Sequence, residues 1–202
     1  PVSIQVNGQW QTFPNARAAE EAAYGEYKDN LRRTAENFRI TDDHLGEGGP
    51  KAKFQANITA IKLLKYLEET TGQATPEQQK ILSRYVGWGG LADAFDPEKP
   101  AWAAEYAQLK ELLTRSEYAA ARGSTLNAHY TSPTVIKAIY EAVGRMGFET
   151  GNILEPSCGV GNFFGMLPEK MRNSRLYGVE LDSISGRIAK QLYPKADITV
   201  AG

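Results

Sequence analysis

A glycine-containing segment late in the sequence combines residue types that can hold a nucleotide-like ligand. In ILEPSCGVGNF, residues 153–163, a short apolar run leads through Gly159 and Gly161 into a predicted helix. Glycine at such a strand-to-helix turn lets the backbone approach a ligand closely. The next apolar run ends in Glu180, and an acidic side chain there accepts hydrogen bonds from ribose hydroxyls. The spacing favours an adenosine-type ligand at the carboxyl ends of parallel strands.

The residues that the loop lacks narrow the choice of ligand class. A dinucleotide fingerprint needs a third glycine three residues after Gly161, where the sequence has Phe164. Phe163 and Phe164 would also crowd the helix N-terminus that a pyrophosphate needs. S-adenosylmethionine has no phosphate, and the carboxylate of Glu155 can pair with its ammonium group. We favour S-adenosylmethionine over NAD, with an ordinary tight strand-to-helix turn as the structural alternative.

Other reactive side chains give weaker predictions. Cys158 lies inside the glycine loop, whereas methylation of cytosine at carbon 5 needs a thiolate on a separate loop, so we expect no nucleophile here. His129 is expected to shape its loop rather than act as a base. Tyr130 either touches the cofactor or packs on the sheet edge. Asp182 either caps the following helix or contacts the adenine amine.

The second half of the chain alternates strands and helices. A helix is predicted from Pro133, because proline is tolerated at a first helical position, and its apolar stripe is Val135, Ile139, Val143 and Met146. Strands follow at 152–154, 175–180 and 197–201, separated by helices at 162–170 and 183–192. Such alternation predicts a parallel sheet with right-handed crossovers.

The first half reads as a hairpin followed by helices. Asn7-Gly8 predicts a type I′ turn between strands in residues 2–13, and Asn15 caps a helix to about residue 33. Residues 40–53 are predicted to be loop. Further helices are indicated by a stripe from Phe54 to Leu67, by Thr75-Pro76, by a stripe from Trp102 to Leu113, and by the capping box Thr114–Glu117.

Two features of these first helices invite functional interpretations. Trp88, between the glycines of VGWGGL, could stack on a base, but packing is favoured. Lys51 and Lys53 of GEGGPKAK could touch a DNA backbone; the segment lacks the spacing of a phosphate-binding loop.

Three motifs resemble those of the amino-methyltransferases of DNA. EPSCGVGNF, residues 155–163, resembles their first motif, and YGVELD, residues 177–182, resembles their second. NAHYTSP, residues 127–133, resembles the tyrosine-threonine-proline motif of the N6-adenine subclass, in which the tyrosine and threonine help to enclose the methionine end of the cofactor. Together these motifs imply that S-adenosylmethionine is bound by Tyr130, Thr131, Glu155, Pro156, Ser157, Cys158, Gly159, Gly161, Asn162, Phe163, Glu180, Leu181 and Asp182.

The first half adds to the resemblance. Residues 40–54 and 85–96 resemble segments that precede the methylase module of very large bacterial proteins on conjugative transposons and phages, where the methylase is joined to a helicase. The implied fold is α/β: a mostly helical lobe, residues 1–125, followed by an incomplete Rossmann-like S-adenosylmethionine-dependent methyltransferase domain, residues 126–202, whose parallel sheet stops after its third strand.

One motif of the resembled enzymes has no counterpart here. They carry Asn or Asp, Pro, then Pro or a hydrophobic residue and an aromatic, which receive the flipped base. We therefore expect a fragment of an adenine-N6 DNA methyltransferase that binds cofactor but transfers no methyl group, holds no catalytic residue and no metal, and meets DNA through the full-length protein. A non-catalytic assembly module with a degenerate Rossmann-like half is the alternative, and a fragment of an RNA or protein methyltransferase is a weaker one.

Composition is compatible with these expectations. The 202 residues are 42% hydrophobic with a net charge of −1, so a surface that contacts nucleic acid is either local or lies outside this segment. A single cysteine and the lack of a membrane-spanning or signal-like run indicate a cytoplasmic protein. In the resembled fold Ile153 and Leu154 lie on a strand built to be interior. We expect the helical lobe, or a second copy in a homodimer, to cover that edge.

Overall fold

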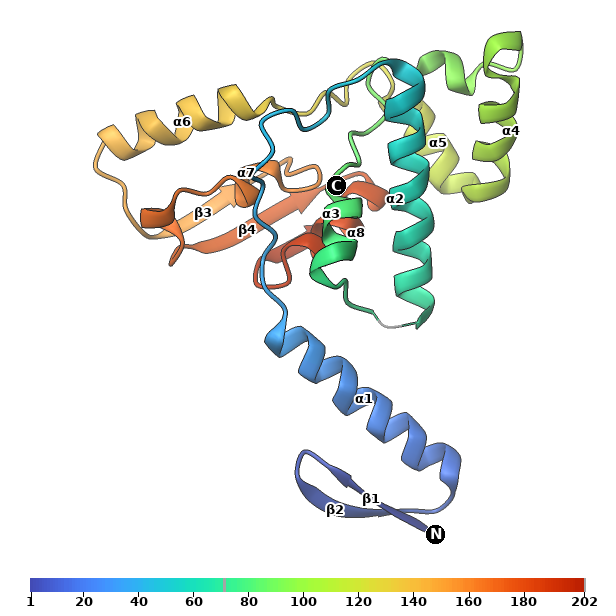
Figure 1. Ribbon diagram of the computed structural model, residues 1–202, viewed down its shortest axis with the longest axis vertical. Coiled ribbons are helices and arrows are strands. Elements are labelled where there is room, and N and C mark those ends of the chain that lie inside the picture. Colours follow the sequence, from blue (N-terminus) through green and yellow to red (C-terminus); the bar gives the residue numbers. More distant parts are fainter. Residues whose placement is uncertain (71, 202) are drawn as a thin grey trace.

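The computed structural model describes the backbone of residues 1–70 and 72–201, and the side chains of all of these except 28 and 31–33. A hairpin of β1 (Val2–Val6) and β2 (Gln9–Phe13) is followed by α1 (Ala16–Thr34), and Figure 1 shows this part extending away from the remainder. Asn7 and Gly8 have φ of 50° and 75°, which confirms the predicted turn. The Asn15 side chain accepts a hydrogen bond from the Ala18 N–H at 2.9 Å, as expected of a cap.

The carboxyl-terminal half forms a three-stranded parallel sheet. β3 (Asn152–Glu155), β4 (Arg175–Glu180) and β5 (Asp197–Val200) lie in the order β3-β4-β5. They are joined by α7 (Asn162–Gly165), the 3-10 helix η3 (Glu169–Met171) and α8 (Ser183–Leu192). The fold is α/β, and this half has the topology of part of a Rossmann-like domain, as predicted.

One crossover differs from the prediction. The continuous helix predicted for residues 162–170 is wrong, because α7 has four residues and gives way to η3. Pro168 has no N–H to donate and disfavours helical backbone in the residue before it, so the helix ends ahead of it. The connection from α7 through η3 to β4 is therefore short, and the loop before α7 stays close to the sheet.

The helical lobe comprises α2 (Pro50–Thr70), α3 (Pro76–Leu82), the 3-10 helices η1 (Ala92–Phe95) and η2 (Pro100–Trp102), α4 (Ala103–Leu112) and α5 (Arg115–Ser124). The capping boxes at Thr75 and Thr114 are both formed. The predicted loop 40–53 is shorter than expected, because α2 already begins at Pro50, a residue suited to a first helical position. No helix within residues 1–70 and 72–201 has the length and apolarity needed to cross a membrane.

A single hydrophobic core runs through the lobe and the sheet. It extends from Phe54 in α2 to Ile198 in β5. Trp88 is 1% exposed and meets Phe54 and Phe95 edge to face, with ring centroids 6.1 and 5.3 Å apart, so its packing role is confirmed. Because the core is continuous, the division into residues 1–125 and 126–202 stays a prediction.

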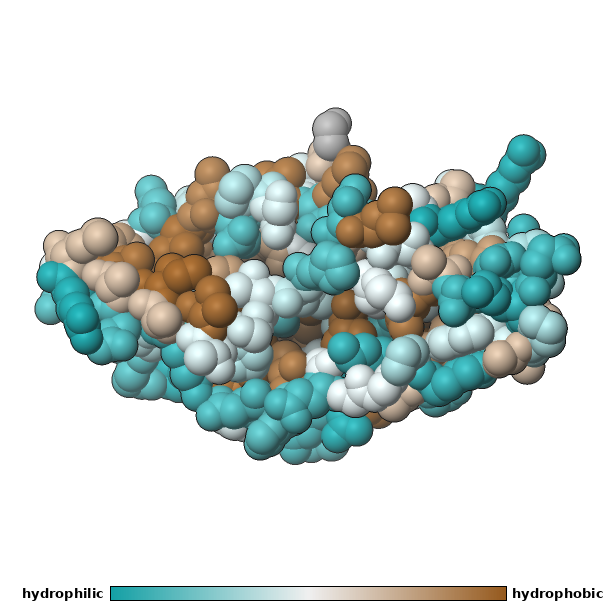
Figure 2. Space-filling model, turned by 90° about the horizontal axis from the view of Figure 1, so that it is seen from above, coloured by the Kyte–Doolittle hydropathy of each residue, from teal (hydrophilic) through white to brown (hydrophobic). Residues whose placement is uncertain are grey.

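α6 (Pro133–Arg145) buries a different face from the one expected. Pro133, Ile136 and Tyr140 are buried, and of the predicted stripe only Val143 packs partly against the core, while Val135 is 47%, Ile139 41% and Met146 84% exposed. Figure 2 shows apolar atoms gathered on the side of the molecule that carries this helix. Both stripes have helical spacing, and contact with Phe163 and the sheet selects the one that contains Tyr140.

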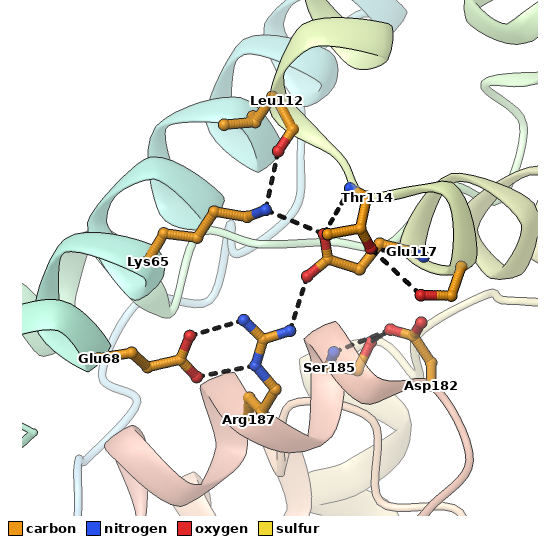
Figure 3. Close-up of polar contacts among 9 residues, drawn as sticks. Lys65, Glu68, Leu112, Thr114, Glu117, Asp182, Ser185 and Arg187 are labelled. Carbon is orange, nitrogen blue, oxygen red and sulfur yellow. Dashed lines mark hydrogen bonds and ion pairs between the residues drawn. The ribbon is translucent and has the colours of Figure 1, made fainter.

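The outer edge of β3 is open. Among the described residues β3 pairs only with β4, and Leu154 is 63% exposed. The expectation that the lobe folds over this edge is wrong, because the lobe packs on α8 at the opposite side of the sheet, through ion pairs that include the buried Glu117 (Figure 3). Pairing of two copies along β3 stays a prediction.

Candidate cofactor-binding site

The glycine loop leaves β3 in a tight turn that is held against β4. The Cys158 N–H donates to the carbonyl of Val179 at 3.0 Å, and the Gly161 N–H donates to the carbonyl of Cys158 at 2.7 Å. Gly159 and Gly161 have φ of 55° and 85°, a conformation that other residues rarely adopt. A Cβ on Gly159 would lie 2.5 Å from Cε1 of Tyr130, so the close approach itself requires glycine.

Glu180 joins this loop to the loop after β4. Its Oε2 accepts a hydrogen bond from the Gly159 N–H at 2.7 Å, and its Oε1 accepts one from the Asp182 N–H at 2.8 Å. A carboxylate has about four lone-pair sites, so each oxygen can accept a further hydrogen bond. The half-buried Glu180 can therefore receive two hydroxyl groups while it fixes both loops.

Asp182 caps α8 and leads to Tyr130. Its carboxylate accepts from the N–H and the hydroxyl of Ser185 at 2.8 and 2.6 Å, which confirms the capping role. The Ser185 hydroxyl lies 2.9 Å from that of Tyr130, whose ring packs on Gly159. Burial raises the pKa of Tyr130, so this phenol stays neutral and acts only as a hydrogen-bond donor and acceptor. Ser185 was not predicted, since its contact with Tyr130 joins residues that are 55 positions apart.

Glu155, which precedes the glycine loop, and the thiol of Cys158 within it have shifted pKa values. Partial burial raises the pKa of Glu155, against a hydrogen bond from the Ser157 backbone that lowers it. Burial, with the nearby carboxylates of Glu180 and Glu155, raises the pKa of Cys158 to about 12. A thiol of that pKa is not a nucleophile at neutral pH, in line with the sequence-based expectation.

The other predicted residues lie around this centre with different exposure. Pro156 and Ser157 are exposed at the end of β3, and Leu181, 77% exposed, presents an apolar side chain beside Glu180. Phe163 is half-buried against Tyr140, whose hydroxyl donates to the Phe163 carbonyl at 2.8 Å.

Thr131 and Asn162 belong to a neighbouring pocket of about 340 Å³, which Tyr130 also lines. Its opposite wall is the loop around Gly46 and Glu47, together with Lys53 of α2. Part of the GEGGPKAK segment therefore faces the predicted cofactor residues, an arrangement that no local pattern revealed. Lys51 points elsewhere: it pairs with Glu105 at 2.7 Å and stacks on Trp102, with Nζ 4.0 Å from the ring centroid.

α8 connects this site to the helical lobe. Arg187, one turn beyond Asp182, donates to both carboxylate oxygens of Glu68 at 2.7 and 2.6 Å and to Glu117 at 2.7 Å (Figure 3). Glu117 also accepts from Lys65 at 2.9 Å. Burial would raise the pKa of Glu117, but hydrogen bonds from Arg187, the Thr114 backbone and Lys65 outweigh it and lower the pKa to about 2. The helix that Asp182 caps is thereby anchored to α2 and α5.

The acceptor groups of the site fit S-adenosylmethionine. The predicted residues include the carboxylates of Glu155, Glu180 and Asp182 and no lysine or arginine, as suits hydroxyl, amine and ammonium groups. A pyrophosphate would find no cation among them, and the four-residue α7 offers it little helix dipole. The arrangement agrees with a cofactor that carries positive charge and no phosphate.

The fold is α/β with an incomplete Rossmann-like half, and its glycine loop and Glu180 form the candidate site. No protein-family model and no solved structure matches the sequence. The chain is similar to the defense against restriction protein B of Escherichia phage P1, with 26% identity over 156 residues, which cover 77% of this chain and 5% of that protein. It is also similar to the type II methyltransferase M.CvrRI of Paramecium bursaria Chlorella virus XZ-6E, with 38% identity over 61 residues, which cover 30% of this chain and 16% of that protein. Part of the chain thus resembles a methyltransferase.

Proposed function

We propose that this chain is the S-adenosylmethionine-binding part of a DNA adenine-N6 methyltransferase. The observation that carries the proposal is the bridge made by Glu180 between the Gly159 and Asp182 N–H groups at 2.7 and 2.8 Å. It presents a carboxylate at the ends of parallel strands, where such folds bind an adenosine ribose. The similarity to a type II methyltransferase, although restricted to 30% of the chain, supports the same class.

The protein's own groups divide the work of binding. With S-adenosylmethionine bound, Glu180 would accept hydrogen bonds from the ribose hydroxyls, Leu181 would offer an apolar surface to the adenine ring, and Glu155 would pair with the ammonium of the methionine tail. Tyr130 covers the glycine loop from the side of α8. The bound cofactor supplies an activated methyl group. The 202 residues contain no Asn/Asp-Pro motif followed by Pro or a hydrophobic residue and an aromatic, so this chain binds the cofactor and the acceptor loop belongs elsewhere.

Calorimetric titration with S-adenosylmethionine and S-adenosylhomocysteine tests the proposal, with NAD as the comparison ligand. We expect a dissociation constant between about 10 µM and 1 mM, since Leu181 and the outer edge of β3 leave the ligand partly in water. NAD should give no heat. Absence of binding by both sulfur ligands at millimolar concentration would favour a non-catalytic assembly role instead.

Glu180→Gln identifies the ribose contact. Loss of charge-assisted hydrogen bonds costs about 1–3 kcal/mol, or roughly 5- to 150-fold in affinity. Glu149→Gln, an exposed glutamate on the loop before β3, is the matched control and should bind like the parent. Equal affinity of both variants, each with the circular dichroism of the parent, would show that Glu180 does not hold the ligand.

A further inference from the structure

A basic groove lies between α4 and α5, away from the residues of the glycine loop. It has a volume of about 550 Å³. Its lining includes the three cations Lys110, Arg115 and Arg122 and no carboxylate. Figure 2 shows a largely hydrophilic surface on the side of the molecule that carries these helices. A chain with a net charge of −1 therefore concentrates positive charge at one hollow.

The groove follows one face of α5. Arg115, Ala119 and Arg122 recur at helical spacing within α5, so their side chains lie along one stripe, and Leu126 follows the end of the helix. The floor of the groove is low at Gly123, because this residue has no side chain and nothing lies within 4 Å of the position that a Cβ would take. Arginines flanking a low floor allow a polyanionic backbone to come near the helix while both guanidinium groups reach it.

The three cations are available for a partner. All three are exposed, and none takes part in an ion pair within residues 1–70 and 72–201. Lys110 lies over the ring of Tyr118, with Nζ 4.0 Å from the centroid, which orients it into the groove. The nearest acidic residue of α5, Glu117, points to the other face and is held by Lys65 and Arg187.

The groove also adjoins the proposed cofactor site along the chain. Leu126, 78% exposed at its end, is followed within four residues by Tyr130, which packs on Gly159. In Figure 1, β4 points toward the side of the molecule that carries α4 and α5. The groove thus lies on the side of the molecule toward which the carboxyl end of β4 points.

We propose that Lys110, Arg115 and Arg122 bind the phosphate backbone of duplex DNA. The choice of DNA rests on the proposed function; the choice of a phosphate backbone rests on the charge and shape of the groove. Contacts of this kind fix position and carry no sequence information. They also release counterions, so their number can be measured from the salt dependence of binding.

The test is fluorescence anisotropy of a labelled duplex of about 20 base pairs with the 202-residue chain between about 50 and 200 mM salt. Three neutralised phosphates give a slope of log K against log salt of about −2.7, or roughly 40-fold weaker binding across this range. The variant K110Q/R115Q/R122Q should lose most of that slope and bind roughly tenfold or more weakly at the lower salt. Gly123→Glu, which adds an opposing charge on open space and leaves the cations intact, should weaken binding in the same way.

The matched control removes three exposed cations outside the groove, as K62Q/K80Q/K190Q, and should keep the slope of the parent. Equal losses in the two triple variants, or none in either, would overturn the assignment. Stronger binding of a single-stranded RNA of the same length would overturn the commitment to duplex DNA. The groove variant should still bind S-adenosylhomocysteine like the parent. A parent that binds DNA through the groove but no cofactor would therefore refute the proposed function alone.

Discussion

Replacing Glu117 by glutamine separates electrostatics from shape at the junction between the lobe and α8. Glutamine keeps the volume of the side chain, but its amide group turns a donor toward Lys65 or Arg187, which are themselves donors. The folded-state pKa of Glu117 is about 2 against an ordinary 4.5. A difference of one in pKa corresponds to about 1.36 kcal/mol, so the ionised carboxylate contributes about 3 kcal/mol at neutral pH. This agrees with the low end of the roughly 3–5 kcal/mol for breaking a buried pair, as expected because Arg187 keeps Glu68.

The pH dependence follows from the direction of the shift. A carboxylate whose pKa is lowered by folding stabilises the protein fully above its unfolded value of 4.5 and loses that contribution as the pH falls toward about 2. The free energy of unfolding of the parent should therefore exceed that of Glu117→Gln by about 3 kcal/mol at pH 7 and by about 2 kcal/mol at pH 3.5.

Urea unfolding followed by tryptophan fluorescence measures this difference, because Trp88 and Trp102 are buried. Glu69→Gln, an exposed glutamate on the same helix as Lys65, is the control and should stay within about 0.5 kcal/mol of the parent at every pH. A loss below about 1 kcal/mol at pH 7, or one that does not shrink in acid, would refute the reasoning that Glu117 is held as a buried anion.

Two further predictions concern the glycine loop. Gly159→Ala should destabilise the protein by about 1–3 kcal/mol more than Gly90→Ala, since both glycines have positive φ but only the new methyl at 159 meets Tyr130. Thermal unfolding measures this difference in stability. The difference should vanish when Tyr130 is also replaced by alanine. Cys158, with a pKa of about 12, should react at pH 8 roughly 10³-fold more slowly with a disulfide reagent than an ordinary thiol, and rapid labelling of the folded protein would show that the thiol is not buried as described.

Local features of the fold were predictable because their partners are close in sequence. The Asn7-Gly8 turn and the caps at Thr75 and Thr114 involve residues within a few positions of one another, and all three are formed. The parallel sheet followed from the alternation of apolar runs with helical ones. Glu180 and Asp182 could be placed beside the loop because the ends of neighbouring parallel strands meet.

Contacts between distant segments were not predictable in the same way. The buried face of α6 was assigned wrongly because Ile136–Tyr140 and Val135–Ile139 have the same spacing, and only the sheet decides between them. The docking of the lobe depends on Arg187, whose partners Glu68 and Glu117 lie 119 and 70 residues away. Nothing in the neighbourhood of any of these residues indicates the others.

The bridge made by Glu180 has a consequence for the thermodynamics of recognition. Two backbone N–H groups, of Gly159 and Asp182, hold its carboxylate, so the rotamer of this long side chain is set when the sheet forms. An immobilised side chain of this kind would otherwise lose about 0.5–1.5 kcal/mol of conformational entropy at the moment of binding. The Glu180 side chain loses this entropy on folding, so the site is preorganised. A ligand that brings two hydroxyl groups gains their hydrogen bonds without first ordering the acceptor.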